Sequence, residues 1–187
     1  MARILILHSS TDGHTIKICE RLRQALARQD HELALHPLAA FDGADLASFN
    51  TVVIGASIRY GKHSPHVPDF IARHQRALER MPSAFFSVNI VARKPEKNRP
   101  ETNPYMKKFL RQIAWRPMLV EVFAGKLDYP RYGFLDRMMI RLIMALTKGP
   151  TDPSTVVEFT DWRQVDAFAR QIGELHRNHQ AAGSSCC

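Results

Sequence analysis

The segment Arg3-Ile-Leu-Ile-Leu7 decides the fold, together with the turn Ser9-Ser-Thr-Asp-Gly-His-Thr15 and the amphipathic stretch 16–27 that follow it. The first run is apolar at successive positions, which is typical of a strand buried on both faces of a parallel sheet. The turn leads directly into a helix, and the first N–H groups of a helix have no internal partner and lie at the positive end of its dipole. These donors predict a phosphate site, which would be completed by the hydroxyls of Ser10, Thr11 and Thr15.

This turn differs from two other nucleotide-binding loops. It has neither a lysine nor the spacing G-x-x-x-x-G-K-[ST], which argues against an NTPase, and it lacks the G-x-G-x-x-G of an ordinary dinucleotide site. The alternative is an ordinary helix N-terminus, since serine and threonine are favoured caps everywhere. Three hydroxyls and a glycine within Ser10–Thr15 favour the phosphate site over that alternative.

Hydrophobic runs alternate with amphipathic stretches along the chain, which predicts an α/β fold with a doubly wound, five-stranded parallel sheet. We expect strands at about 3–8, 31–36, 51–57, 83–91 and 118–125. We expect helices at about 14–28, 66–79, 104–114 and 161–177. The 187 residues should form one domain over 1–177, followed by a disordered tail at 178–187.

Cysteine usage and hydropathy favour a cytoplasmic protein. Cys19 is expected on the inner face of the first helix, and Cys186 and Cys187 lie in the tail, so the sequence indicates no disulfide framework. No segment is apolar over the roughly eighteen residues that a membrane-spanning helix needs. No signal peptide is expected before the first strand.

The positive charge is concentrated in the second half of the chain. The formal net charge is +8, from 26 lysines and arginines against 18 acidic residues. Eight basic residues stand against two acidic ones between Arg93 and Arg116, and five stand against two between Lys126 and Lys148, so these segments hold all of the excess. Such focusing attracts anionic partners. Nucleic acid is the least favoured of them, because no binding motif and no regularly interleaved aromatic residues accompany the charge.

A long insert at about 126–154 begins after the fifth strand has begun and precedes a short extended run at 155–159. It is longer than a plain connection in such a fold. At its centre, 134–146 has the pattern of a methionine-rich helix with an apolar half, bordered by Arg137 and Arg141. Two interpretations stay open: an extra helix packed on the domain, or an interfacial helix lying on a membrane.

The ligand of a doubly wound sheet binds outside the carboxyl ends of the strands, at the switch point of the strand order. The segments after the third and fourth strands should therefore meet the phosphate turn. Tyr60 between glycines suits a flat heteroaromatic ring, and Arg93 would offset negative charge on it; the alternatives are a surface aromatic and a solvated loop. The residues predicted to contact the ligand are Ser10, Thr11, Asp12, Gly13, His14, Thr15, Ser57, Ile58, Arg59, Tyr60, Gly61, Ser87, Val88, Asn89, Ile90, Val91, Ala92 and Arg93.

The phosphate turn resembles the loop [ST]-x-T-G-x-T of the flavodoxin superfamily, in which Ser10, Gly13 and Thr15 match and Asp12 stands where a threonine is common. Further segments are similar to those of the bacterial, flavodoxin-like protoporphyrinogen IX dehydrogenases of the menaquinone-dependent type. These segments are 53–61, 81–89, 91–97, 115–117 and 129–132. The resemblance covers about residues 2–175, includes the insert, and is compatible with Asp12. It implies a flavodoxin-like fold with FMN as the cofactor.

The resemblance also implies a reaction in heme biosynthesis, in which electrons pass from protoporphyrinogen IX through FMN to a membrane quinone, either menaquinone or ubiquinone. It implies a peripheral position on the inner (plasma) membrane, with the anionic membrane surface as a partner. The residues expected on the substrate or membrane face are Lys94, Lys97, Tyr129, Arg131, Tyr132, Arg137 and Arg141.

No metal site or catalytic acid–base set stands out. The pairs His63/His66 and His176/His179 have i, i+3 spacing, but no cysteine or carboxylate cluster accompanies them, so we expect no metal. A flavin enzyme does not need such a set, because the cofactor carries the electron chemistry. Two other functions stay open, an NAD(P)H:quinone reductase and a flavodoxin-type electron carrier without its own substrate. The oligomeric state also stays open, including a homo-oligomer.

Overall fold

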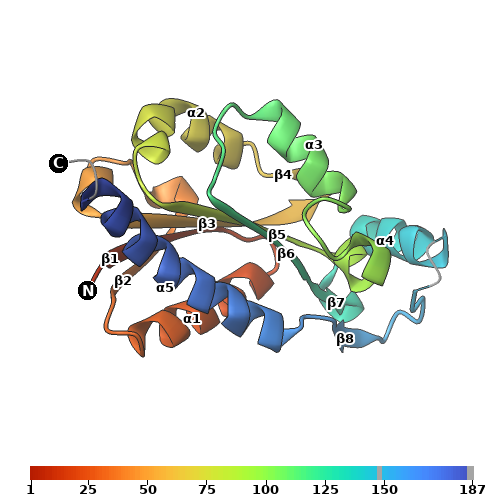
Figure 1. Ribbon diagram of the computed structural model, residues 1–187. Helices are drawn as coiled ribbons and strands as arrows, with labels where there is room; N and C mark the ends of the chain where they lie inside the picture. The colour runs from red at the N-terminus through yellow and green to blue at the C-terminus, as the bar shows by residue number, and fades with distance from the viewer. Residues whose placement is uncertain (147–148, 185–187) are drawn as a thin grey trace.

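The sheet has five parallel strands, as the sequence predicts, in the order β2-β1-β3-β5-β6 (Figure 1). The computed structural model describes residues 1–146 and 149–184. The order reverses between β1 and β3, which places a ligand-binding crevice at their carboxyl ends. The strands are β1 (Arg3–Ser9), β2 (Glu32–Pro37), β3 (Thr51–Arg59), β5 (Ser83–Asn89) and β6 (Leu119–Ala124).

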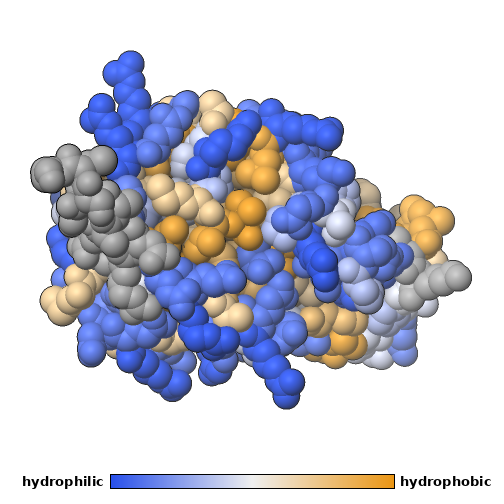
Figure 2. All heavy atoms as spheres, in the orientation of Figure 1, coloured by the Kyte–Doolittle hydropathy of each residue, from blue (hydrophilic) through white to orange (hydrophobic). Residues whose placement is uncertain are grey.

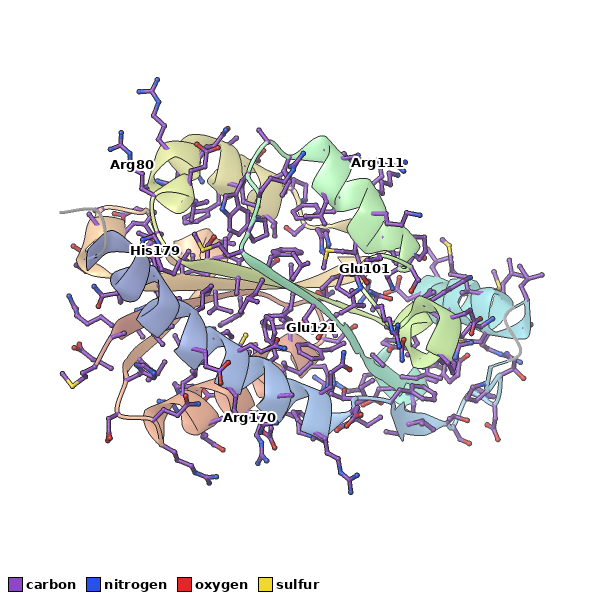
Figure 3. The ribbon with its side chains drawn as sticks, in the orientation of Figure 1. Arg80, Glu101, Arg111, Glu121, Arg170 and His179 are labelled. Atoms are coloured by element: carbon purple, nitrogen blue, oxygen red, sulfur yellow. The ribbon has the colours of Figure 1, made fainter. Side chains whose placement is uncertain are left out.

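Two pairs of helices cover the two faces of the sheet (Figure 1). α1 (His14–Ala27) and α5 (Trp162–Ser184) lie on one face, and α2 (His66–Glu79) and α3 (Pro104–Gln112) lie on the other. All four expected helices are confirmed, and α5 continues past its expected end at 177 to Ser184. The last part of the expected tail, 185–187, lies outside the described residues. Figure 3 shows that Arg80, Arg111 and Arg170 point from these helices into solvent.

Successive residues of β1 face opposite layers of the protein, and the four from Ile4 to Leu7 are buried. Ile4 and Ile6 pack with α1 and α5, whereas Leu5 and Leu7 pack with α2 and α3. Cys19 of α1 is also fully buried, and burial raises the pKa of its thiol, so it acts as a small hydrophobe as predicted. Burial on both faces is the reason why β1 is apolar at each position from Ile4 to Leu7.

Two elements at the carboxyl end of the sheet differ from the sequence prediction. The fourth strand, expected at 83–91, ends at Asn89, because its side chain accepts a 3.0 Å hydrogen bond from Ala92 N and begins a 3₁₀ turn. β3 runs on to Arg59 and forms a hairpin with β4 (Lys62–His63). The connecting residues Tyr60 and Gly61 have φ of 50° and 75°, as in the usual two-residue hairpin turn.

The insert leaves the sheet after β6 and forms a small unit of its own. β7 (Lys126–Asp128) pairs with β8 (Val156–Glu158) in an antiparallel ribbon, so the two ends of the insert lie side by side. α4 (Phe134–Leu146), the expected helix, lies beyond the carboxyl end of the sheet (Figure 1). The core of this unit is formed by Leu127, Tyr129, Tyr132 and Met144.

Most of the large apolar side chains of α4 are exposed. Only Met144 of this helix is buried, whereas Phe134 is 77% exposed, Leu135 74% and Leu142 62%. Hydrophobic residues accordingly reach the surface at the right-hand end of the molecule in Figure 2, where α4 lies in Figure 1. α4 thus packs on the insert through Met144 and Ile140, and both interpretations of this helix stay open. In the described part of the chain, no helix combines the length and hydropathy required to cross a bilayer.

Candidate functional site

A cavity of about 600 Å³ lies at the carboxyl ends of β1, β3 and β5. The phosphate turn, the β3–β4 hairpin, the turn after β5 and the insert all contribute to its wall, which is mostly apolar. The predicted cofactor residues therefore converge on one place. Those that line the cavity are Ser10, Asp12, His14, Thr15, Ser57, Ile58, Arg59, Tyr60, Gly61, Val88, Asn89, Ile90 and Val91.

The remaining predicted cofactor residues do not line the cavity. Thr11 Oγ1 lies 3.4 Å from Ser57 Oγ, so it joins the phosphate turn to β3. The Arg93 guanidinium donates a 3.1 Å hydrogen bond to Ile90 O, and burial lowers its pKa. The predicted role of Arg93 beside a reduced ring therefore has no support from its position. The other residues outside the wall are Gly13, Ser87 and Ala92.

The phosphate turn leaves one hydroxyl unused. Gly13 adopts a φ of 85°, and its N–H donates a 3.0 Å hydrogen bond to Ser10 Oγ, which shapes the turn before α1. Thr15 is 1% exposed, and its Oγ1 has no hydrogen-bond partner within the described part of the chain. A buried hydroxyl without a partner costs about 1–3 kcal/mol. An anion at this helix N-terminus would accept its hydrogen bond.

An ion-pair network joins three of the segments around the cavity. Arg59 Nη1 contacts the two carboxylate oxygens of Asp12 at 2.9 and 3.1 Å, and its Nη2 contacts Asp136 of α4. The Tyr60 hydroxyl donates to the same Asp136 carboxylate. Arg59 therefore neutralises Asp12 in the phosphate turn and also ties α4 to the β3–β4 hairpin. Neutralisation explains how a carboxylate can stand where flavodoxins commonly have threonine.

Asp136→Asn is expected to loosen α4 without disturbing the sheet. The substitution weakens two charge-assisted hydrogen bonds at a partly exposed site, so the free energy of unfolding should fall by about 1 kcal/mol. Amide hydrogen exchange should become faster in the first turn of α4 and stay unchanged in the central strands. Glu174→Gln, a matched change at an exposed position of α5, is the control. Equal exchange of α4 in both variants would show that Asp136 does not hold this helix.

The imidazole of His14, the first residue of α1, is kept in its neutral form. Burial lowers the pKa of its ring, and its Nε2 lies 2.6 Å from Thr160 Oγ1. The Thr160 hydroxyl donates to Ala124 O at 2.7 Å, so it accepts a hydrogen bond from His14 Nε2–H. The ring therefore contributes no full positive charge to the phosphate turn, and helix N–H groups and hydroxyls dominate that end of the cavity.

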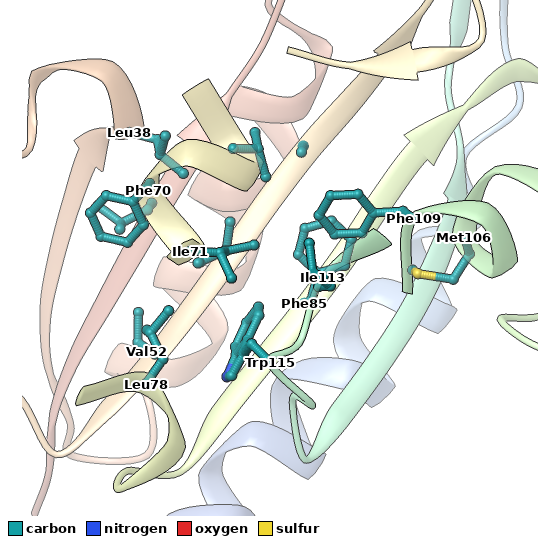
Figure 4. Close-up of a cluster of buried hydrophobic side chains, with 14 of the residues drawn as sticks. Leu38, Val52, Phe70, Ile71, Leu78, Phe85, Met106, Phe109, Ile113 and Trp115 are labelled. Atoms are coloured by element: carbon teal, nitrogen blue, oxygen red, sulfur yellow. The ribbon is translucent and has the colours of Figure 1, made fainter. Parts of the chain in front are cut away.

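His63 supports the hairpin from beneath. Its Nδ1 lies 3.2 Å from Ser57 O, and its ring packs edge-on against Phe85 and Phe109, which are shown in Figure 4. His63 of the pair His63/His66 is therefore a packing residue, whereas His66 is exposed. Within the described residues there is no group of three or more histidine, cysteine or acidic side chains placed to hold a metal ion.

The burial of His63 predicts a loss of stability in acid. Burial lowers its pKa from 6.5 to about 4, so below pH 6.5 the unfolded chain binds a proton that the folded protein resists. Stability is therefore complete above pH 6.5 and falls as the pH drops towards 4, with about 2 kcal/mol lost by pH 5. Chemical denaturation at pH 7 and pH 5 measures this loss. His63→Gln keeps a donor for Ser57 O and lacks the titration, so its unfolding free energy should change less; an equal change would contradict the prediction.

The insert residues predicted for the substrate or membrane face divide into two groups. Arg131 and Tyr132 line the cavity. Tyr129 is fully buried in the core of the insert, and the guanidinium groups of Arg137 and Arg141 donate to backbone oxygens of Tyr129, Tyr132 and Thr151. Arg137 is partly buried and engaged by the protein, whereas Arg141 stays exposed although it donates to Thr151 O. Lys94 lies between two 3₁₀ turns and Lys97 ends the second, and both residues are outside the cavity wall.

Several wall residues were missing from the sequence prediction. Tyr105 comes from α3, and its contribution follows only from the packing of that helix beside the hairpin. The amphipathic pattern of α4 could have indicated that some of its apolar residues face the ligand, but not which ones. The residues missed are Tyr105, Gly125, Lys126, Leu127, Asp128, Met139, Ile140 and Ile143.

A parallel sheet of this order, with a phosphate turn after its first strand and an apolar cavity beside it, is the arrangement of a flavin-binding flavodoxin domain. The family model of the flavodoxin domain matches residues 5–154. The solved structure of oxidised flavodoxin 1 from Bacillus cereus covers 95% of this chain and 98% of its own, with a TM-score of 0.53 and 12% identity. At that identity the likeness supports the fold alone.

Two curated relatives are much more similar in sequence. The protoporphyrinogen IX dehydrogenase (quinone) of Escherichia coli K12 is 44% identical over 173 residues, which are 92% of this chain and 96% of the relative. The protein of the same name from Leishmania major is 44% identical over 175 residues, which are 92% of this chain and 75% of the relative. The chain belongs to the flavodoxin family and, within it, to the protoporphyrinogen IX dehydrogenase (quinone) enzymes.

Proposed function

We propose that this protein oxidises protoporphyrinogen IX to protoporphyrin IX with FMN as cofactor and passes the electrons to a membrane quinone, as a step of heme biosynthesis. One observation carries the proposal: the wall that includes the phosphate turn also includes Met139, Ile140 and Ile143 of α4. A single cavity thus joins a flavodoxin-type cofactor site to an apolar helix that ordinary flavodoxins have no need of. Tetrapyrroles and quinones are both largely apolar, which suits this side of the cavity.

The residues around the cavity fit FMN. The unpartnered Thr15 hydroxyl and the N-terminus of α1 suit its phosphate, and Arg59 removes the repulsion that a free Asp12 carboxylate would exert. The apolar residues Ile58, Val88, Ile90 and Val91 suit a flat ring system. When bound, FMN supplies the two-electron redox chemistry, and three rounds of two electrons and two protons separate protoporphyrinogen IX from protoporphyrin IX.

The protein supplies position and a dry environment. Ser10 and Thr15 would hold the phosphate, and the hairpin would hold the ring edge through backbone groups of Ser57–Gly61. Tyr60 is 63% exposed, in the left-handed region, and fixed by Asp136, so it forms a rigid rim. Met139 and Ile143 reduce the access of water to the apolar side, where substrate and quinone would bind.

We further propose that α4 rests on the lipid surface, which places the protein at the cytoplasmic side of the inner membrane as a peripheral protein. The exposed apolar half of α4 supports this position, because large apolar side chains contribute about 1.5–3 kcal/mol each when they leave water. Arg137 and Arg141 bond to backbone oxygens, so hydrophobic burial, rather than their attraction to anionic head groups, would dominate the contact.

An anaerobic assay tests the reaction directly. Purified protein with FMN is given protoporphyrinogen IX and a menaquinone analogue, and porphyrin fluorescence is followed against an enzyme-free autoxidation control. Quinone-dependent porphyrin formation above this control is expected, and its absence would overturn the proposal. Rapid reduction of the flavin by NAD(P)H, without porphyrinogen turnover, would instead favour an NAD(P)H:quinone reductase. One-electron exchange with a reductase alone would favour an electron carrier.

A further inference from the structure

The cations in the cavity wall are not equivalent. Lysine and arginine contribute three residues to the wall in the described part of the chain: Arg59, Lys126 and Arg131. Arg59 is shared by the Asp12 and Asp136 carboxylates, and Lys126 Nζ lies 2.7 Å from Asp128 Oδ2. Two of the three are therefore neutralised inside the protein.

Arg131 is the exception. Across residues 1–146 and 149–184, its guanidinium has no hydrogen bond or ion pair with the protein, and the residue is exposed at the cavity. A guanidinium offers planar, paired N–H donors that match a carboxylate, and it loses less hydration than an ammonium group on binding. An unpaired arginine at the rim of an apolar cavity is thus suited to a ligand that is mainly apolar and carries a carboxylate.

The backbone on both sides of Arg131 is fixed. Tyr129 is fully buried and donates from its hydroxyl to Pro150 O at 2.8 Å. Tyr132 N donates to Tyr129 O at 3.1 Å, and the Arg137 side chain donates to both Tyr129 O and Tyr132 O. Arg137 therefore acts as an internal brace for the turn that carries Arg131. Such a brace reduces the entropy that the turn would lose when a ligand binds.

We propose that Arg131 binds a carboxylate of the tetrapyrrole, one of its propionate groups, and so selects carboxylate-bearing macrocycles over uncharged ones. This inference rests on the proposed function and assigns the charge recognition of that site to one residue. Arg131 is a specificity-determining residue here, because the redox chemistry belongs to the cofactor.

Binding of protoporphyrin IX and of its dimethyl ester to the FMN-loaded protein tests the assignment without turnover. Quenching of flavin fluorescence in a fixed detergent buffer gives both affinities. The wild type should bind the diacid about 10-fold more tightly than the diester, and Arg131→Gln should lose this preference while keeping its affinity for the diester. Arg131→Lys keeps the charge but not the paired donors, so it should keep part of the preference.

Arg80→Gln is the matched control, because Arg80 points into solvent beside α2, at the end of the molecule away from α4 (Figure 3). It should keep the full preference for the diacid.

The inference is wrong if Arg131→Gln still binds the diacid more tightly than the diester, or if the wild type binds diacid and diester equally. Release of FMN from Arg131→Gln on gel filtration would assign the guanidinium to the cofactor phosphate instead. Loss of affinity for anionic vesicles with the preference intact would assign it to lipid head groups. Both results would overturn the inference, whereas failure of the proposed function appears separately, as absence of quinone-dependent oxidation by the wild type.

Discussion

Replacing Leu135 and Leu142 with glutamate is expected to weaken binding to anionic lipid vesicles by about 100-fold or more. Both side chains are mostly exposed on α4, and neither lines the cavity. Losing the burial of two leucines removes about 3–6 kcal/mol from the interaction with lipid, before any repulsion of the new carboxylates is counted. Vesicle sedimentation measures the binding. Turnover with a quinone embedded in the vesicles should fall with it, whereas turnover with a water-soluble quinone analogue should not.

The comparison with soluble quinone separates loss of membrane contact from damage to the site. Met118→Glu is the control, because Met118 is 48% exposed but precedes β6, at the amino end of the sheet, whereas α4 lies beyond its carboxyl end. It should leave both vesicle binding and turnover unchanged. If the doubly substituted α4 variant still sediments with vesicles like the wild type, α4 is not the membrane contact. If it fails equally with both quinones, the two leucines act on the site itself.

Thr15→Val is expected to stabilise the protein without cofactor and to weaken FMN binding. Valine has the shape of threonine without the hydroxyl that lies buried and unpartnered. Removing this hydroxyl should raise the free energy of unfolding of the cofactor-free protein by about 1 kcal/mol. The same hydroxyl would donate to the phosphate, so the Kd for FMN should rise about 10- to 100-fold. Denaturant titration of the cofactor-free protein and fluorescence titration with FMN measure the two effects.

Thr51→Val provides the matched control for this pair of effects. Thr51 is fully buried at the start of β3, and its hydroxyl is also without a partner in the described structure. It lies at the amino end of the sheet, away from the cavity. Thr51→Val should therefore stabilise the protein to a similar extent and leave the affinity for FMN unchanged. Unchanged FMN affinity in Thr15→Val would remove the hydroxyl from the phosphate site.

The main fold could be predicted from the sequence because strands that are buried on both faces are apolar at successive positions. β1 lies between two helical layers, so each of Ile4–Leu7 had to be apolar, and this pattern is unambiguous. The end of β5 was harder, because Ile90 and Val91 continue the apolar run. The strand ends where the Asn89 side chain accepts a hydrogen bond from Ala92 N, and a hydropathy pattern does not reveal such a bond. The β3–β4 hairpin was hidden for a similar reason, since tyrosine is an unusual residue at a position with positive φ.

The candidate site shows the same division. The phosphate turn and the two following loops could be placed, because strand order alone brings their ends together. The hydrogen-bond partners of Arg59, Arg137 and Arg141 could not be predicted, because they depend on tertiary contacts. Arg137 and Arg141 donate to backbone oxygens. Because every residue has a backbone oxygen, no sequence pattern shows which one will accept the bond. Asp136, which holds both Arg59 and Tyr60, is one acidic residue in a helix and carries no local signal.

The β7–β8 ribbon makes the insert exchangeable. Because Asp128 pairs with Val156, the chain leaves and re-enters the flavodoxin body at neighbouring points. A two-residue hairpin turn would be long enough to close that gap. The appendage between these points could therefore be shortened, replaced or transplanted onto another flavodoxin while the sheet keeps its register. A flavodoxin domain could acquire a new substrate or a new location in the cell in this way, through exchange of one insert and without changes in its core.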